Sequence, residues 1–163
     1  MSRKEDYVKF WNSYIDYCVG KGSTIFTLED KIPEGKLIDH SKTKTFGYLK
    51  IDLNANLKLG KVNIYAIRVE NYINIPNKPE LNKKIFAVFK NHEVEIRSQL
   101  SALGWDIIFY EPEDKKNRKI YIPGKGLQYN GECDVELFDF FHRASEDLYR
   151  VLRPIYDSMA FLK

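Results

Sequence analysis

Cysteine and histidine are scarce in this 163-residue chain, which contains two of the first and three of the second. The two cysteines, Cys18 and Cys133, are too few for a disulfide framework or for a cysteine-rich zinc site. The histidines are scattered along the chain and lack the spacing of zinc ligands. The fold must therefore depend on aliphatic and aromatic packing, and we expect neither a metal ion nor another cofactor.

Long hydrophobic runs are also missing. One of the longest, residues 105–110, contains Asp106, whereas roughly 20 apolar residues are needed to cross a bilayer. The N-terminal sequence MSRKEDY has no apolar signal-peptide segment. We therefore expect a cytoplasmic protein that has no membrane partner.

No charge of one sign dominates the composition. The chain has 26 lysines and arginines against 23 acids, and a formal net charge of +3 does not by itself indicate a nucleic-acid-binding or membrane-binding protein. Apolar residues make up 44% of the chain and aromatic residues 14%. This composition and length predict one compact domain over residues 1–163.

The first half of the chain combines one helical pattern with two alternating patterns. Apolar residues spaced three and four apart predict a helix over residues 4–20. The polar residues 21–45 predict a long loop that holds one short strand at 36–40. Alternating apolar and polar residues predict strands over 46–55 and 61–70, joined as an antiparallel hairpin.

The second half repeats this plan. Apolar residues that would share one side of a helix, followed by Gly104, predict a helix over residues 80–102. Short segments rich in β-branched and aromatic residues, 105–111 and 118–122, predict a second hairpin. An apolar stripe predicts the last helix over 133–162. The order αββαββα predicts an α+β domain in which helices pack on an antiparallel sheet of about four strands.

Four motifs, taken in their order and spacing, resemble one known family. They are FW at residues 10–11, LSALGW at 100–105, KKNRKI at 115–120 and LRPI at 152–155. Over most of its length the chain is similar to DUF4268, a family of uncharacterised bacterial and archaeal domains. Members often stand at the C-terminus of proteins with a restriction-type nuclease half, so the resemblance implies an accessory role in DNA processing or defence and no catalytic residue. The family's usual strand pattern is IgVELyI, from which KVNIYAIR at residues 61–68 departs, since it lacks the acid.

Basic side chains cluster in two segments, residues 31–61 and 115–131, with tyrosines among them. A groove of cations with aromatic platforms holds nucleic acid without reading its sequence, and we expect the two segments to meet after folding. The predicted binding residues are Lys115, Lys116, Arg118, Lys119, Lys125, Lys42, Lys44 and Tyr121. The competing interpretation is that these side chains only form a solvated surface.

The function predicted from these features is a non-enzymatic accessory module that binds DNA or a partner nuclease. One alternative is a divergent metal-dependent nuclease, because Asp52 and Glu70 fall on neighbouring predicted strands. That chemistry also needs a lysine two residues after the second carboxylate, where Tyr72 stands, so two solvated strand ends are the plainer interpretation. The other alternative is a protein-interaction domain or homo-oligomer, suggested by 11 tyrosines, 10 phenylalanines and two tryptophans.

Overall fold

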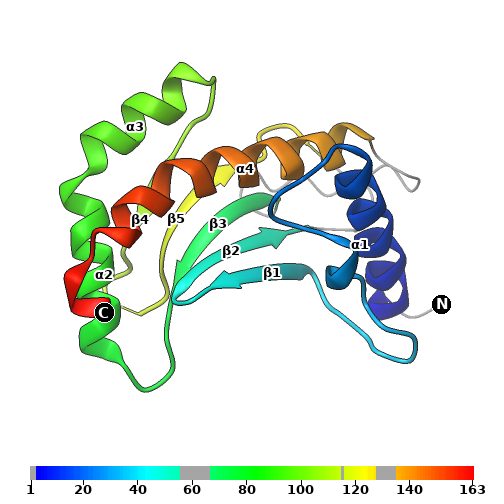
Figure 1. Cartoon of the computed structure of the whole chain (residues 1–163), viewed down its shortest axis with the longest axis horizontal. Helices are drawn as coiled ribbons and strands as arrows, with labels where there is room; N and C mark the ends of the chain where they lie inside the picture. The colour runs from blue at the N-terminus through cyan, green and yellow to red at the C-terminus, as the bar shows by residue number, and fades with distance from the viewer. Residues whose placement is uncertain (1–2, 56–66, 115, 128–134) are drawn as a thin grey trace.

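Five antiparallel strands form one open sheet in the computed structural model of the chain (Figure 1). The structure describes residues 3–55, 67–114, 116–127 and 135–163. The strands are β1 (Ser41–Phe46), β2 (Leu49–Asn54), β3 (Arg68–Ile73), β4 (Ile108–Tyr110) and β5 (Arg118–Pro123), and their order in the sheet is β1-β2-β3-β5-β4. This arrangement confirms the predicted α+β fold, with five strands in place of about four.

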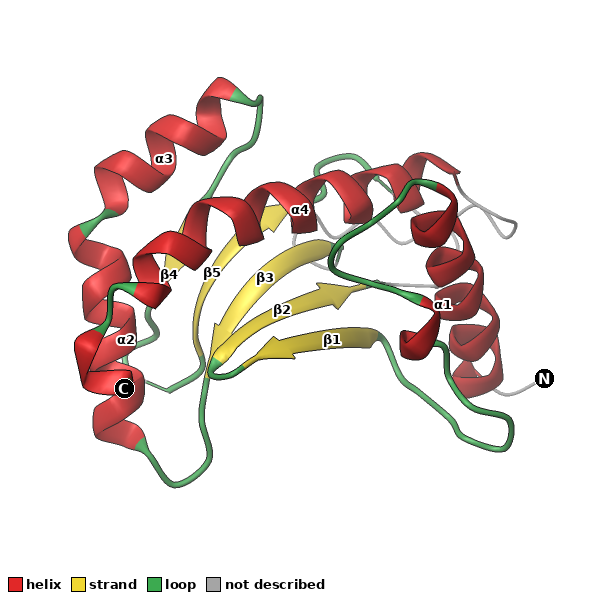
Figure 2. Ribbon diagram, viewed as in Figure 1, coloured by secondary structure: helices red, strands yellow, loops and turns green. Residues whose placement is uncertain are grey.

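Helices pack along one face and the ends of this sheet (Figure 2). They are α1 (Arg3–Gly20), α2 (Pro79–Asn91), α3 (Glu93–Ala102) and α4 (Val135–Asp157), with two short 3-10 helices, η1 (Leu28–Asp30) and η2 (Ala160–Leu162). Helix α4 crosses the sheet and contacts β2 and β3. Helix α1 packs against α4 at one end of the sheet, while α2 contacts β3 and β5 at the other.

Alternation of side chains along each strand determines which face α4 covers. Leu49, Ile51 and Leu53 of β2 are buried, as are Val69 of β3 and Ile122 of β5. These side chains join the apolar stripe of α4 in one core, and burying each of them contributes about 1.5–3 kcal/mol. The residues between them point to the other face of the sheet.

Aromatic packing joins α1 to α4. Trp11 and Tyr14 are fully buried, and their ring centroids lie 5.5 and 5.8 Å from that of Phe141. Phe138 adds a further contact, with its centroid 5.7 Å from that of Tyr14. Such tilted and edge-on pairs are worth about 0.5–1.5 kcal/mol each beyond the area they bury. The structure therefore confirms the first predicted helix and shows what holds it.

The strand predicted at residues 36–40 is wrong, because the edge strand β1 begins at Ser41. It turns directly into β2 through Gly47 and Tyr48. Gly47 adopts a left-handed conformation with a φ of 66°, which suits a tight turn. The backbone N–H of Tyr48 donates to the hydroxyl of Tyr156 at 2.8 Å, so the turn is fixed to the C-terminal part of α4.

Two further predictions differ from the structure. The strand predicted at 61–70 corresponds to β3, which begins only at Arg68, and residues 61–66 lie outside the described ranges. The helix predicted over 80–102 is two helices, because His92, with a φ of −99° and a ψ of 15°, ends α2 before α3 begins.

Strand β4 and the final α-helix, α4, are also shorter than predicted. Only three residues of 105–111 form β4, because Trp105 leaves the sheet to pack on α4, where its Nε1 donates to Asp147 at 2.7 Å. The final helix, predicted over 133–162, is described from Val135 and ends at Asp157, after which the chain forms η2.

We expect Gly47→Ala to destabilise the protein by about 2 kcal/mol or more in urea denaturation. A left-handed backbone costs an L-residue about 1–2 kcal/mol, and a Cβ at this position would also lie 2.7 Å from Tyr156 Oη. The control is Gly35→Ala. Gly35 also has a positive φ, of 81°, but no atom lies within 4 Å of a Cβ added there, so this substitution should lower the free energy of unfolding by about 1 kcal/mol. Equal losses in the two variants would contradict a role for the Tyr156 contact.

Candidate nucleic-acid interface

The sheet face opposite α4, called the polar face below, gathers charged and aromatic side chains from β2, β3, β4 and β5, and hydroxyl side chains from β1. Because successive residues of a strand alternate between faces, the register of the strands fixes its members. The polar face consists of Ser41, Thr43, Thr45, Lys50, Asp52, Asn54, Arg68, Glu70, Tyr72, Ile108, Tyr110, Lys119, Tyr121 and Pro123.

Lys119 is the central cation of this face. Its Nζ lies 5.5 Å from the ring centroid of Tyr72 and 5.6 Å from that of Tyr110. Lys50 approaches the same Tyr72 ring from β2, with its Nζ 5.9 Å from the centroid. Each such contact is worth about 0.5–1 kcal/mol at an exposed site. Two lysines from different strands therefore meet at one tyrosine.

A shallow recess of about 190 Å³ lies beside these rings, lined by Arg68, Tyr110, Lys119 and Tyr121. Tyr110 is 43% exposed, whereas Tyr121 is buried at 8%. The recess thus places two cationic groups and two phenol rings around one small depression of the surface.

Two carboxylates, Asp52 and Glu70, lie directly opposite each other on β2 and β3. Thr43 Oγ1 donates to Asp52 Oδ1 at 2.5 Å, and Asn54 Nδ2 donates to both acids, at 3.2 Å to Asp52 Oδ2 and 3.1 Å to Glu70 Oε1. Arg68 Nε donates to Glu70 Oε2 at 2.9 Å. Each of the four carboxylate oxygens therefore already accepts a hydrogen bond from a neighbouring side chain.

The proximity of the two acids changes the titration of one of them. Burial raises the pKa of Asp52, and the adjacent charge of Glu70 adds to this effect, so that the pKa moves from 3.8 to about 6 even though Thr43 and Asn54 donate hydrogen bonds to the carboxylate. Glu70 is 3% exposed and also has Lys119 Nζ 3.6 Å from its Oε2. Three cations thus share the polar face with two acids, and one of these acids takes up a proton near pH 6.

The residues predicted for the β5 segment do not share one face. Lys119 and Tyr121 lie on the polar face. Arg118, although adjacent in sequence, points to the opposite side and is only 5% exposed, with its Nε donating to Glu111 at 2.6 Å. Sequence neighbours on a strand cannot act on the same surface, because their side chains alternate.

The other predicted residues near β5 lie off the polar face. Lys116 is exposed in the turn that precedes β5. Lys125 follows β5 and forms an ion pair with Asp106. Lys115 lies outside the described residues.

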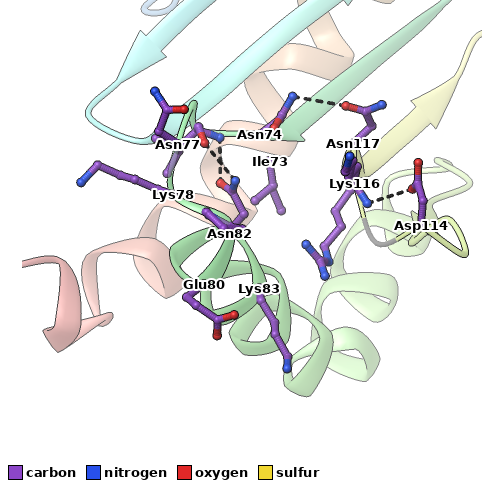
Figure 3. Close-up of a pocket in the computed structure, with 13 residues that line it drawn as sticks. Ile73, Asn74, Asn77, Lys78, Glu80, Asn82, Lys83, Asp114, Lys116 and Asn117 are labelled. Atoms are coloured by element: carbon purple, nitrogen blue, oxygen red, sulfur yellow. Dashed lines mark hydrogen bonds between the residues drawn. The ribbon is translucent and has the colours of Figure 1, made fainter.

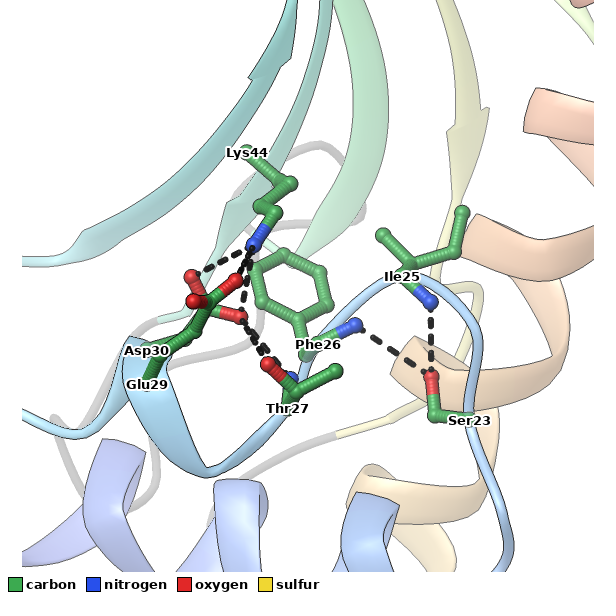
Figure 4. Close-up of polar contacts among 7 residues, drawn as sticks. All are labelled: Ser23, Ile25, Phe26, Thr27, Glu29, Asp30 and Lys44. Carbon is green, nitrogen blue, oxygen red and sulfur yellow. Dashed lines mark hydrogen bonds and ion pairs between the residues drawn. The ribbon is translucent and has the colours of Figure 1, made fainter.

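Lys42 and Lys44 lie on the edge strand β1 with their side chains on the opposite side of the sheet from the polar face. Lys44 Nζ donates to both carboxylate oxygens of Asp30 at 2.9 Å, and Asp30 accepts the backbone N–H of Thr27 at 2.8 Å (Figure 4). Burial lowers the pKa of Lys42. The expected single groove therefore does not form from these lysines, because Lys44 fastens η1 to the sheet and β2 and β3 separate β1 from β5.

Four charged or aromatic residues of the polar face, Lys50, Arg68, Tyr72 and Tyr110, are not among the predicted binding residues. The signal was present in RVENYI, residues 68–73, where charged or aromatic residues occupy every second position. The strand predicted at 61–70 ends before Tyr72 and so does not contain the whole pattern. Lys119 was missed as a neighbour of Glu70, because the two residues lie on different strands.

No protein-family model matches the chain, and neither does any curated protein or solved structure. Within the described ranges, no helix combines the length and the apolar character required to cross a bilayer. The geometry of the polar face is therefore the basis for a functional hypothesis.

We expect the free energy of unfolding to fall as the pH rises from about 4 to about 7, by up to about 3 kcal/mol from Asp52 alone. The folded state keeps the Asp52 proton up to a pKa of about 6, whereas the unfolded chain releases it near 3.8. Urea denaturation at a series of pH values measures this slope. Asp52→Asn should flatten the slope, and an unchanged slope in that variant would contradict the assignment.

Proposed function

We propose that this protein is a non-enzymatic module that binds single-stranded nucleic acid on its polar face, as an accessory part of a DNA-processing or defence system. The observation that carries the proposal is the convergence of Lys50 and Lys119 on the ring of Tyr72. The recess that contains Tyr110 and Arg68 lies next to this point.

A single strand fits this surface better than a duplex. The bases of a duplex are stacked inside it, whereas a single strand exposes base faces that stack on aromatic side chains, at about 1–3 kcal/mol per base. Tyr110 offers an exposed ring for such stacking. Lys119 lies within 6 Å of both tyrosine centroids, which puts positive charge where the phosphates next to a stacked base would run.

The partners that Lys119 already has leave it able to bind phosphate. Its Nζ lies 3.6 Å from Glu70 Oε2, whereas a charge-assisted hydrogen bond measures about 2.7–2.9 Å. An ammonium group has three donors, so a phosphate can replace this long contact at little cost. Glu70 would then keep its hydrogen bonds from Arg68 and Asn54.

The resemblance to DUF4268 supports the accessory role. The segment that forms β3 with the residue before it reads IRVENYI, and it agrees with the family pattern IgVELyI at Ile67, Val69, Glu70, Tyr72 and Ile73. In this alignment the acid of the family pattern is Glu70. Because members of that family often accompany restriction-type nucleases, a nuclease partner that acts on the bound strand fits this proposal.

Fluorescence anisotropy with a labelled single-stranded oligonucleotide tests the proposal. We expect Lys119→Ala and Lys50→Ala each to weaken binding about three- to tenfold, and to lower the slope of log affinity against log salt concentration by about 1. Tyr110→Ala should weaken binding with no change in this slope, because it removes the exposed ring for stacking and no charge.

The matched control is Lys21→Ala, which removes an exposed lysine just after α1, away from the sheet. It should leave both the affinity and the salt slope unchanged. Absence of binding at low salt, an affinity that does not depend on salt, or an equal loss in Lys21→Ala would contradict the proposal.

A second candidate function, a divergent metal-dependent nuclease, is favoured by one observation. Lys119 brings to Glu70, the neighbour of Asp52, the lysine that is missing from the linear motif, although it comes from β5. If this candidate is right, the protein cleaves DNA with Mg²⁺ or Mn²⁺, EDTA stops the cleavage, and Asp52→Asn lowers the rate by about 100-fold or more. Lys21→Ala is again the control, and cleavage that survives EDTA or Asp52→Asn removes this candidate.

A further inference from the structure

A cavity of about 400 Å³ lies at the end of the sheet, where the link from β3 to α2 meets the turn between β4 and β5 (Figure 3). Both sides of the cavity contribute cations. Lys78 and Lys83 come from the start of α2, and Lys116 and Arg118 come from the turn and the first residue of β5. Chain segments about 35 residues apart in sequence thus place positive charge around one space.

Most of this positive charge is not neutralised by the protein. Lys78, Lys83 and Lys116 form no ion pair with any described residue, in contrast to Lys31, Lys44 and Lys125. The two acids in the lining, Glu80 and Asp114, are fewer than the four cations, and Asp114 accepts the backbone N–H of Lys116 at 2.9 Å.

Arg118 is the most deeply placed of the four cations. It is 5% exposed, and it lines the cavity. Its Nε donates to Glu111 at 2.6 Å, while its terminal nitrogens donate to no side chain or backbone group of the described residues. A guanidinium has five N–H donors, so those of its terminal nitrogens remain for a ligand.

The helix start adds donors at the same place. Asn82 holds the link to α2 in position, since its Oδ1 accepts the N–H of Ile75 at 2.7 Å and its Nδ2 donates to the carbonyl of Ile75 at 3.1 Å. The N-cap residue, Lys78, makes no side-chain capping hydrogen bond. Pro79, the first residue of this 13-residue helix, has no N–H, so the groups that add to a site that already attracts anions are the N–H groups of Glu80 and Leu81.

The cavity adjoins the polar face through Tyr72. The hydroxyl of Tyr72 donates to Asn117 Oδ1 at 2.6 Å, and Asn74 Nδ2 donates to both atoms at 3.2 Å. Asn74 and Asn117 line the cavity, and the bond between them is drawn in Figure 3. A strand lying across Tyr72 would therefore arrive at the cavity when it reaches the end of the sheet.

We propose that this cavity binds a phosphate monoester, and that the terminal phosphate of a bound nucleic-acid strand is its source. The second part rests on the proposed function, whereas the first part does not. A terminal phosphate carries up to two charges and three acceptor oxygens, which match a cavity lined by cations on two sides better than a bridging phosphodiester with one charge does.

The test compares oligonucleotides of one sequence that carry a 5′-phosphate, a 3′-phosphate or neither, by competition in fluorescence anisotropy. We expect one of the two phosphates to increase the affinity about tenfold, the effect of one or two charge-assisted hydrogen bonds. Lys116→Ala and Lys83→Ala should abolish this gain and leave the affinity for the unphosphorylated strand within about twofold. Lys84→Ala, an exposed neighbour of Lys83 that does not line the cavity, is the matched control and should keep the gain.

Calorimetric titration with AMP and with inorganic phosphate separates this inference from the proposed function. Oligonucleotides that bind equally with and without a terminal phosphate, together with no binding of AMP or phosphate, overturn the phosphate site and leave the polar face intact. Binding of AMP or phosphate that is lost in Lys116→Ala, without binding of any oligonucleotide, supports the site and overturns the strand as its source. A phosphate gain that survives in both Lys116→Ala and Lys83→Ala also overturns the site.

Discussion

Every side chain on the central strands points either toward α4 or toward the polar face, because successive residues of a strand alternate. Burial of Leu53 and Val69 beneath α4, and of Ile122 in the same core, fixes this choice for β2, β3 and β5 together. A shift of one residue in any of these strands would expose its apolar set and bury its charges. The positions of Lys119 and Tyr72 on the other face are therefore a direct consequence of the hydrophobic core.

The polar face is stabilised by its own side chains and is also able to exchange partners. Asn54 holds the two carboxylates together, and Arg68 neutralises part of their charge, so an acid pair that would otherwise be costly to bury is fully hydrogen-bonded. Lys119 takes part in this network only through a 3.6 Å ion pair with Glu70. The network thus holds Lys119, the cation that lies between the two tyrosines, less firmly than it holds Arg68, whose Nε lies 2.9 Å from the same oxygen.

Much of the fold was predictable from periodicity, since the helices and both hairpin regions carry clear patterns. Three features could not be predicted from periodicity. Strand β1, SKTKTF, contains one apolar residue, Phe46, and therefore has no alternation of apolar and polar residues. Its pairing with β2 and the turn at Gly47 define it as a strand. The break at His92 leaves the apolar spacing on both sides intact. The predicted strand at 61–70 ends three residues before β3 does, at Ile73, and its residues 61–66 lie outside the described ranges.

In the candidate site, runs of charge in the sequence did not predict which cations lie close together. Arg118 and Lys119 belong to one basic run, yet one lines the cavity beside α2 and the other lies on the polar face. Lys50 and Lys119 are 69 positions apart, yet both approach Tyr72. Charge runs in a sequence locate basic segments, but only strand register and sheet order decide which cations act together.

The most direct test of the central claim is a map of backbone amide chemical-shift changes in ¹⁵N-labelled protein titrated with a short single-stranded oligonucleotide. The structure predicts that the largest changes fall on Lys50, Tyr72, Tyr110 and Lys119, on four different strands of one face. Changes confined to Lys42, Lys44 and the segment around η1, with the polar face unaffected, would contradict the account.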